Sequence, residues 1–245
     1  MSPKSKPHSR SCGVNKAIQE YQTLVFDCDG VVLNSNKIKT QAFYEATKHF
    51  SHESAQAMVD YHKANGGVSR YIKFKFFVTH ILKQDFDETL NQDLLNRFAQ
   101  AVRKGLMSCE IAQGLEKLKY ENPINNWLIV SGGDQVELQE IFEARRIAHY
   151  FSGGIFGSPD TKEAILAREL KSGNITMPAL FLGDSEYDYQ ASQVAELDFV
   201  FLTEWSEVEN PRAWCADRKI SFFADLVNVM INKSTYEDKK LSPLK

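Results

Sequence analysis

The sequence of 245 residues contains only four cysteines, Cys12, Cys28, Cys109 and Cys215. They are widely spaced and none forms a C-x-x-C pair, which argues against a structural zinc site and against a disulfide framework. Free cysteines of this kind are typical of a reducing compartment. We therefore expect a cytoplasmic protein whose stability comes from a hydrophobic core.

Long apolar runs and a strong net charge are also lacking. No apolar run approaches the roughly 18 residues that cross a bilayer, and the formal net charge is only -3. This mild acidity leaves no electrostatic footprint for nucleic acid or an anionic membrane. The first twenty residues are basic and polar without an apolar segment, so they are not typical of a secretory signal. We expect a flexible tail at 1–20, and neither nucleic acid nor membrane as a partner.

The first informative stretch is the short apolar run 24–26, which is followed at once by Asp27-Cys28-Asp29-Gly30. Such a run, ending in acidic and small residues, is typical of a buried parallel strand. Open α/β sheets bind ligands beyond the carboxyl ends of their strands. Two carboxylates so close repel each other unless a cation lies between them, which favours a hard divalent ion such as Mg²⁺. A strand that merely ends in an acidic turn is the alternative.

The chain then changes pattern twice. Apolar residues recur at helical spacing from residue 34 to residue 109, and no convincing strand is found between residues 33 and 125. Beyond this region, apolar runs of strand length alternate with amphipathic helices. The expected strands are 127–130, 179–182 and 199–202. The expected helices are 136–148, 162–170, one that follows Ser185 and runs through Ala195, and 223–231. Such alternation predicts a parallel sheet with right-handed crossovers.

These patterns predict an α/β fold with two parts. A Rossmann-like parallel sheet flanked by helices would be formed by 21–34 and 112–235. An all-helical domain at 35–111 would be inserted directly after the first strand. A short tail is expected at 236–245.

Two more of the expected strands end in polar residues. One precedes Ser131-Gly132-Gly133, and the other precedes Gly183-Asp184-Ser185, with Asp188 one helical turn further on. The carboxyl ends of parallel strands share one edge of the sheet, so these groups are expected to converge with Asp27 and Asp29. Their oxygen atoms suit Mg²⁺. Lys162, at the start of a helix, is placed to neutralise a phosphate.

In chain order, Asp27-x-Asp29-Gly30, Ser131, Lys162 and Gly183-Asp184-x-x-x-Asp188 resemble the four motifs of the haloacid dehalogenase (HAD) superfamily. The resemblance covers about residues 22–205. The helical insertion between the first two motifs is similar to the cap of the phosphoglycolate phosphatase and β-phosphoglucomutase branch. This resemblance implies a Mg²⁺-dependent phosphatase that hydrolyses a small phosphomonoester through an aspartyl-phosphate.

The resemblance also implies a role for each motif residue. Asp27 would be the nucleophile, and Asp29 would act as general acid and base. The metal ligands would be Asp27, the backbone carbonyl of Asp29, Asp184 and, directly or through water, Asp188. Ser131, the backbone N–H of Gly132, and Lys162 would bind the phosphoryl oxygens. Asp29 argues against dehalogenation, because the dehalogenases lack this second aspartate.

The expected cap contains the residues that would select the substrate. Gly66-Gly67-Val68-Ser69-Arg70 resembles a loop that this branch extends over the active site, and in the mutases the matching arginine contacts a substrate phosphate. We expect Arg70, with Lys73 close by, to bind an anionic group of the substrate. A solvated turn between helices is the alternative.

Two other functions stay open at this point. One is a β-phosphoglucomutase-like phosphomutase, which is disfavoured because Lys39 occupies the place of a histidine in the mutases. The other is a catalytically silent HAD-fold binding module, which the intact motifs disfavour. The sequence determines neither the substrate nor the choice between monomer and homodimer.

Overall fold

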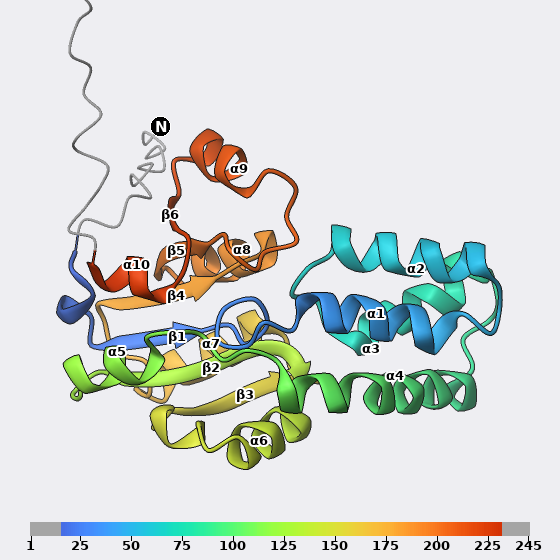
Figure 1. Cartoon of the computed structure of the whole chain (residues 1–245), viewed down its shortest axis with the longest axis horizontal. Helices are drawn as coiled ribbons and strands as arrows, with labels where there is room; N and C mark the ends of the chain where they lie inside the picture. Colours follow the sequence, from blue (N-terminus) through green and yellow to red (C-terminus); the bar gives the residue numbers. More distant parts are fainter. Residues whose placement is uncertain (1–15, 232–245) are drawn as a thin grey trace, which may run out of the picture.

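The computed structural model describes residues 16–231. Their core is a parallel sheet of six strands in the order β3-β2-β1-β4-β5-β6, with helices on both faces (Figure 1). The strands are β1 (Thr23–Phe26), β2 (Asn126–Asp134), β3 (Gly154–Ser158), β4 (Ala179–Gly183), β5 (Asp198–Leu202) and β6 (Ser221–Phe223). The predicted α/β class with a Rossmann-like parallel sheet is confirmed.

Most helices around the sheet connect successive strands; the first of them precedes β1 and the last follows β6. They are η1 (Ile18–Glu20), α5 (Leu115–Glu121), α6 (Gln135–Ala144), η3 (Ala148–Tyr150), α7 (Lys162–Lys171), α8 (Glu186–Val194), α9 (Pro211–Arg218) and α10 (Leu226–Ile231). No helix in residues 16–231 has both the length and the apolar character that crossing a membrane requires.

The inserted segment is entirely helical and lies beyond the carboxyl end of the sheet (Figure 1). It comprises α1 (Asn36–Thr47), α2 (His52–Ala64), α3 (Arg70–Phe76), the π-helical turn η2 (Phe77–Ile81) and α4 (Glu88–Ser108). Aromatic rings fill its interior; the centroids of Phe43 and Phe98, for example, are 4.4 Å apart. The predicted absence of strands between 33 and 125 is confirmed, apart from one isolated bridge between Leu33 and Ile111. The assignment of 35–111 to a separate domain stays a prediction.

Strand β1 is central and buried on both faces, as expected of a strand between two helical layers. Leu24 and Phe26 pack in the hydrophobic cluster on one side of the sheet, and Val25 packs in the cluster on the other side. Phe26 lies level with Ile129 of β2 and Leu182 of β4. The residues that follow these three positions therefore meet at one edge, which places Asp27 beside the ends of β2 and β4.

Several predicted boundaries are wrong. The strand expected at 127–130 runs on to Asp134, with a register shift after Val130. The helix expected at 136–148 ends at Ala144, shortly before Arg146 adopts a positive φ of 58°. The helix expected at 223–231 begins only at Leu226, because 221–223 form a strand.

Two strands and two α-helices of the structure were not predicted from the sequence, namely β3, β6, α5 and α9. Strand β3 lies in a glycine-rich segment, and glycine disfavours strands when considered alone. At the N-terminus the predicted tail extends too far, because Ile18 is buried in the core. The remainder of the tail, 1–15, lies outside the described residues, as does the tail predicted at 236–245.

Candidate active site

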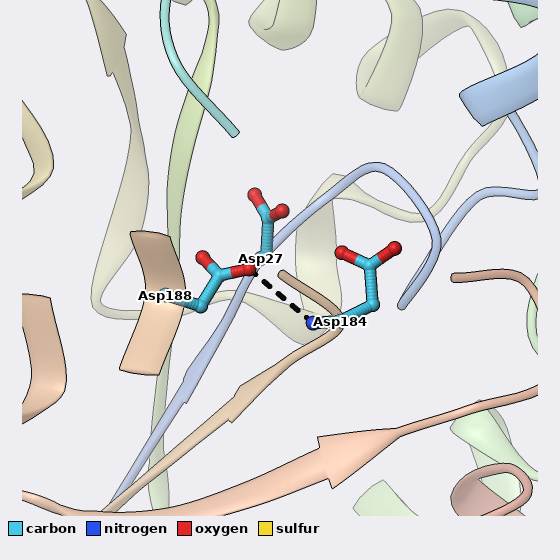
Figure 2. Close-up of side chains that lie close together, drawn as sticks. All are labelled: Asp27, Asp184 and Asp188. Atoms are coloured by element: carbon cyan, nitrogen blue, oxygen red, sulfur yellow. Dashed lines mark hydrogen bonds between the residues drawn. The ribbon is translucent and has the colours of Figure 1, made fainter. Parts of the chain in front are cut away.

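Three carboxylates meet at the carboxyl edge of the sheet (Figure 2). Asp27 follows β1, Asp184 follows β4, and Asp188 lies in the first turn of α8. One oxygen of each lies within 4.8 Å of the others, and all three side chains are buried. The structure thus brings together three of the four residues predicted to bind a metal.

Lys162, the first residue of α7, is the one cation of residues 16–231 that forms ion pairs inside this group. Its Nζ lies 2.9 Å from Oδ1 of Asp27 and donates a short hydrogen bond to Oδ1 of Asp188. Burial alone would lower the pKa of Lys162, but Asp188 and Asp27 outweigh it and raise the pKa. The ammonium is therefore charged at neutral pH and fixed beside Asp27.

Both carboxylate oxygens of Asp188 already accept hydrogen bonds from other groups of the protein. Its Oδ1 accepts from Lys162, and its Oδ2 accepts from the hydroxyl of Ser185 at 2.6 Å and from the backbone N–H groups of Asp184 and Ser185. Ser185 is also the N-cap of α8. Asp188 therefore orients both Lys162 and the turn that carries Asp184, which leaves it little capacity to ligate a metal directly.

Asp27 and Asp184 have free oxygen atoms. Oδ1 of Asp27 is buried and makes no hydrogen bond to any other residue of 16–231, although it is in ion-pair range of Lys162. Asp184 accepts one side-chain hydrogen bond, from Asn36 to its Oδ2 at 2.7 Å. These two carboxylates are the ones available to a ligand.

The charges of this site do not balance. Three carboxylates against one ammonium leave two negative charges, which is the charge that one divalent cation neutralises. Burial and the charge of Asp188 raise the pKa of Asp27 to about 7. The pKa of Asp184 is also raised well above its ordinary value, by burial and then by Asp188 and Asp27. Buried oxygen ligands that repel one another are the donor set that Mg²⁺ prefers, so the residues fit this ion.

We expect Mg²⁺ to stabilise the folded protein through this site. At about 100 times its Kd, a ligand that binds only the folded state adds about 2.7 kcal/mol to the free energy of unfolding. The Asp184→Asn variant should be more stable than the wild type without metal, because one buried like charge is gone, but its melting temperature should not respond to Mg²⁺. Thermal melts with Mg²⁺ and with EDTA measure both effects, with the exposed Asp217→Asn as control. An equal Mg²⁺ response in both variants would exclude this site.

The side chain of Asp29 has different hydrogen-bond partners from that of Asp27. The hydroxyl of Ser35 donates to its Oδ1 at 2.5 Å, and the ammonium of Lys39 donates to its Oδ2. Burial raises the pKa of Asp29, but Lys39 and Ser35 outweigh burial and lower it. The turn between Asp27 and α1 needs Gly30, whose φ is 76° and where a Cβ would lie 2.0 Å from Oδ2 of Asp184. Asp29 is therefore held as a carboxylate close to the three-carboxylate group.

The segment predicted to bind phosphoryl oxygens ends β2. Ser131 is fully buried, and its Oγ accepts from the backbone N–H of Gly133 at 3.1 Å. At Gly132, a Cβ would lie 1.9 Å from the carbonyl oxygen of Gly67. The loop between α2 and α3 therefore lies directly on the end of β2, and only glycine permits this approach.

A cavity of about 730 Å³ opens between the sheet edge and the helical segment. The sheet side contributes Asp27, Asp29, Gly132, Gly133 and Asp184, the helical side contributes Lys39, Phe43, His62, Arg70, Lys73 and Phe98, and Glu207 and Trp214 close it from a third side. Two of the three carboxylates, Asp27 and Asp184, thus line a cavity large enough for a small molecule.

Arg70 lines this cavity but is engaged by the core. Its two Nη atoms donate to both carboxylate oxygens of Glu137, at 2.5 and 3.0 Å, and its guanidinium lies 4.5 Å from the ring centroid of Phe98. The next residue, Tyr71, donates to Asp134 at 2.6 Å. The alternative of a solvated turn is wrong, because Arg70 is only 6% exposed. Substrate binding by Arg70 stays a prediction, and it requires exchange of Glu137 for the substrate anion.

Lys73 lies one turn after Arg70 and is a second buried basic residue that lines the cavity. It is 1% exposed, and its Nζ lies 2.7 Å from Nδ1 of His62. Burial, followed by the charges of Lys73 and Lys39, lowers the pKa of His62 to about 2, so its ring is neutral and Nδ1 accepts. Burial and the charge of Lys39 lower the pKa of Lys73 to about 7. Sequence reasoning placed Lys73 only near Arg70; its position at helical spacing on the same face as Phe74 and Phe77, which are both buried, was the available signal.

The depressed pKa of Lys73 predicts a pH-dependent gain in stability on removal of its charge. Between about pH 7 and its ordinary pKa the unfolded chain binds more protons at Lys73, so the burial penalty is complete below pH 7 and fades as the pH rises. The Lys73→Met variant should therefore be more stable than the wild type, by roughly 2 kcal/mol more at pH 6 than at pH 9. Urea denaturation at the two pH values measures the difference. A gain that does not change with pH would mean that Lys73 is not buried as a cation.

Comparison with known proteins is consistent with this geometry. A family model described as haloacid dehalogenase-like hydrolase matches residues 24–202. No curated protein matches the chain in sequence. Among solved structures, a predicted phosphoglycolate phosphatase from Haemophilus somnus 129pt has 20% identity and a TM-score of 0.65, with 85% of this chain and 96% of that chain covered.

Two more solved structures share the arrangement. A predicted phosphatase from Clostridium acetobutylicum has 20% identity and a TM-score of 0.64, with 82% of this chain and 93% of that chain covered. A protein from Bacteroides vulgatus, provisionally named as a β-phosphoglucomutase, has 17% identity and a TM-score of 0.63, with 84% and 85% covered. At such identities the likeness establishes the fold alone.

Proposed function

The chain belongs to the haloacid dehalogenase-like hydrolase family, and from this premise we propose that it is a Mg²⁺-dependent phosphatase of a small phosphomonoester. The observation that carries the proposal is the placement of Lys162 between Asp188 and Asp27, of which Asp27 lines the cavity. A carboxylate that lines a cavity and lies beside a fixed ammonium is suited to attack phosphorus. Asp27 is therefore the nucleophile.

In the first step an oxygen of Asp27 forms a bond to phosphorus, and the bond from phosphorus to the substrate oxygen breaks. Asp29 gives its proton to the leaving alcohol. Because Lys39 and Ser35 hold Asp29 as a carboxylate, this ion pair must open before Asp29 can carry that proton. Lys162, with the hydroxyl of Ser131 and the N–H of Gly132, binds the transferring phosphoryl oxygens.

In the second step water attacks the aspartyl-phosphate. Asp29 accepts a proton from that water, phosphate leaves, and the carboxylate of Asp27 is restored. Mg²⁺ held by Asp27, Asp184 and the backbone carbonyl of Asp29, with Asp188 acting directly or through water, would supply positive charge that neutralises the phosphoryl oxygens. The occupied oxygens of Asp188 favour the water-mediated form.

The phosphomutase is the second candidate. It shares the aspartyl-phosphate but returns the phosphoryl group to the substrate, so it must keep water away from the intermediate. Lys39, which pairs with Asp29, stands at the place of the histidine that the resemblance gives to the mutases. This departure ranks hydrolysis above the mutase.

The proposal is tested by phosphate release from a panel of sugar phosphates, phosphorylated sugar acids and phosphoglycolate, with Mg²⁺ and with EDTA. Metal-dependent release is the expected result. Isomerisation of a hexose phosphate with a bisphosphate primer, and no release, would identify the mutase instead. Silence in both assays, with p-nitrophenyl phosphate included, would favour the binding module.

A further inference from the structure

The first turn of α1 contacts the carboxyl edge of the sheet through three polar side chains. Ser35, the N-cap of this helix, and Lys39 both donate to Asp29. Asn36, the first residue of α1, donates instead to Asp184, the carboxylate that follows β4. Asn36 is therefore the residue of this turn that touches a proposed metal ligand.

The amide of Asn36 is held in one orientation. Its Nδ2 donates to Oδ2 of Asp184 at 2.7 Å and to the backbone carbonyl of Trp205 at 2.9 Å. A carboxylate and a carbonyl can only accept hydrogen bonds, so the amide must turn its nitrogen, and not its oxygen, toward them. Both hydrogen atoms of Nδ2 are then used, and the side chain of Asn36 is fixed between two acceptors.

The surroundings of Asp184 leave room for this contact and support it. At Gly30, a Cβ would lie 2.5 Å from Nδ2 of Asn36 and 2.0 Å from Oδ2 of Asp184, so a larger residue would push the two groups apart. The hydroxyl of Ser206 donates to the backbone carbonyl of Asp184 at 2.6 Å. Asp184 is thus held by one contact on its backbone and by another on its carboxylate.

The contact with Asn36 determines which oxygen of Asp184 is available to a cation. Oδ2 accepts from Asn36, whereas no residue of 16–231 donates to Oδ1. A hydrogen-bond partner of this kind fixes the orientation of a metal-ligating carboxylate. It also stabilises the charge of Asp184 beside Asp27 and Asp188 without adding a competing charge.

We propose that Asn36 is a positioning residue of the metal site, and that its amide holds the carboxylate of Asp184 in the orientation that binds Mg²⁺. The proposal rests on the proposed function, in which Asp27 and Asp184 hold this ion. It adds to the site a residue that comes from the helical segment and not from the sheet. Asn36 acts through Asp184 and is not itself a metal ligand.

Calorimetric titration with Mg²⁺ tests the proposal without any substrate. In Asn36→Leu the side chain keeps nearly the same shape but has no donor, so the Kd for Mg²⁺ should rise about 10- to 100-fold. Asn34→Leu is the matched control, because Asn34 donates to Glu110 at 3.1 Å in an exposed contact. It should keep the wild-type Kd. Asp184→Asn should abolish binding, which assigns the measured Kd to this site.

Phosphate release separates positioning from a purely structural role. In Asn36→Leu the Mg²⁺ concentration that gives half-maximal activity should rise by the same factor as the Kd, and kcat at saturating Mg²⁺ should fall by less than this factor. A variant that is only destabilised would lose activity equally at every Mg²⁺ concentration, and its melting temperature in EDTA would be lower. If Asn36→Leu does not fold, Asn36→Ala removes the same donor and should give the same change.

The outcomes for this residue and for the phosphatase are distinguishable. An unchanged Kd in the Asn36 variants, or an equal rise in Asn34→Leu, would overturn the positioning role. A wild type that binds no Mg²⁺ would overturn it together with the metal site. A wild type that binds Mg²⁺ in a manner dependent on Asn36, yet releases no phosphate, would support the positioning role and count against the phosphatase alone.

Discussion

Replacement of Asp27 by asparagine is expected to lower kcat for phosphate release by about 10⁴- to 10⁶-fold, the range seen when a covalent nucleophile is removed. The amide nitrogen and oxygen fill the same space but do not form a stable bond to phosphorus. A steady-state assay on the best substrate of the panel, with Mg²⁺ in excess, measures the loss.

The same variant controls for unfolding. The pKa of Asp27 is raised to about 7 by burial and by Asp188, so its ionised form is unfavourable in the metal-free protein at neutral pH and above. Asp27→Asn should therefore melt at or above the wild-type temperature in EDTA. Asp217→Asn, on the exposed surface, should change neither quantity. An Asp27→Asn protein that keeps more than about a hundredth of the activity would contradict the assigned nucleophile.

The second large effect is expected at Lys162, where one substitution should lower both stability and activity. Lys162→Met leaves Asp188 buried without its partner, and loss of one member of a buried ion pair costs about 3–5 kcal/mol. Removal of a group that stabilises the phosphoryl oxygens should lower kcat by about 10²- to 10³-fold. Urea denaturation and phosphate release measure the two losses.

A double variant separates the two roles of Lys162. Addition of Asp188→Asn to Lys162→Met removes the stranded charge, so part of the lost stability should return while activity stays low. Lys171→Met, at the exposed far end of the same helix, is the matched control. If Lys162→Met keeps the wild-type kcat and loses only stability, Lys162 is a structural residue and does not bind the phosphoryl group.

The sequence alone predicts which residues meet at the carboxyl edge of the sheet. Apolar runs of strand length, each ending in Asp27, Ser131 or Asp184, predict parallel strands whose carboxyl ends meet, and the register of β1 with β2 and β4 agrees. This works because the apolar pattern and length of a strand are local properties of the sequence, and alternation of strands with helices favours a parallel sheet. The same reasoning missed β3, whose glycines disfavour a strand and whose pairing to β2 depends on tertiary contacts.

The sequence did not predict which side chains form pairs around the cavity. Arg70 and Glu137 are 67 positions apart, and the pairing of Lys73 with His62 joins two different helices. No periodicity encodes such contacts, because they depend on how the helical segment packs on the sheet. Lys39 was noticed only as a departure from the mutases, although its contact with Asp29 lies within ten positions along the chain.

Covalent capture of the phosphoryl group on Asp27 is the most direct measurement. Asp29→Asn should slow the second step, while p-nitrophenyl phosphate, whose leaving group needs no proton, still permits the first. After acid quenching, mass spectrometry of the peptide that contains Asp27 should show one phosphoryl group that hydroxylamine removes and that is missing when Asp27→Asn is added. A wild type that releases phosphate, with no acyl phosphate at Asp27 in the Asp29→Asn protein, would contradict the proposed mechanism.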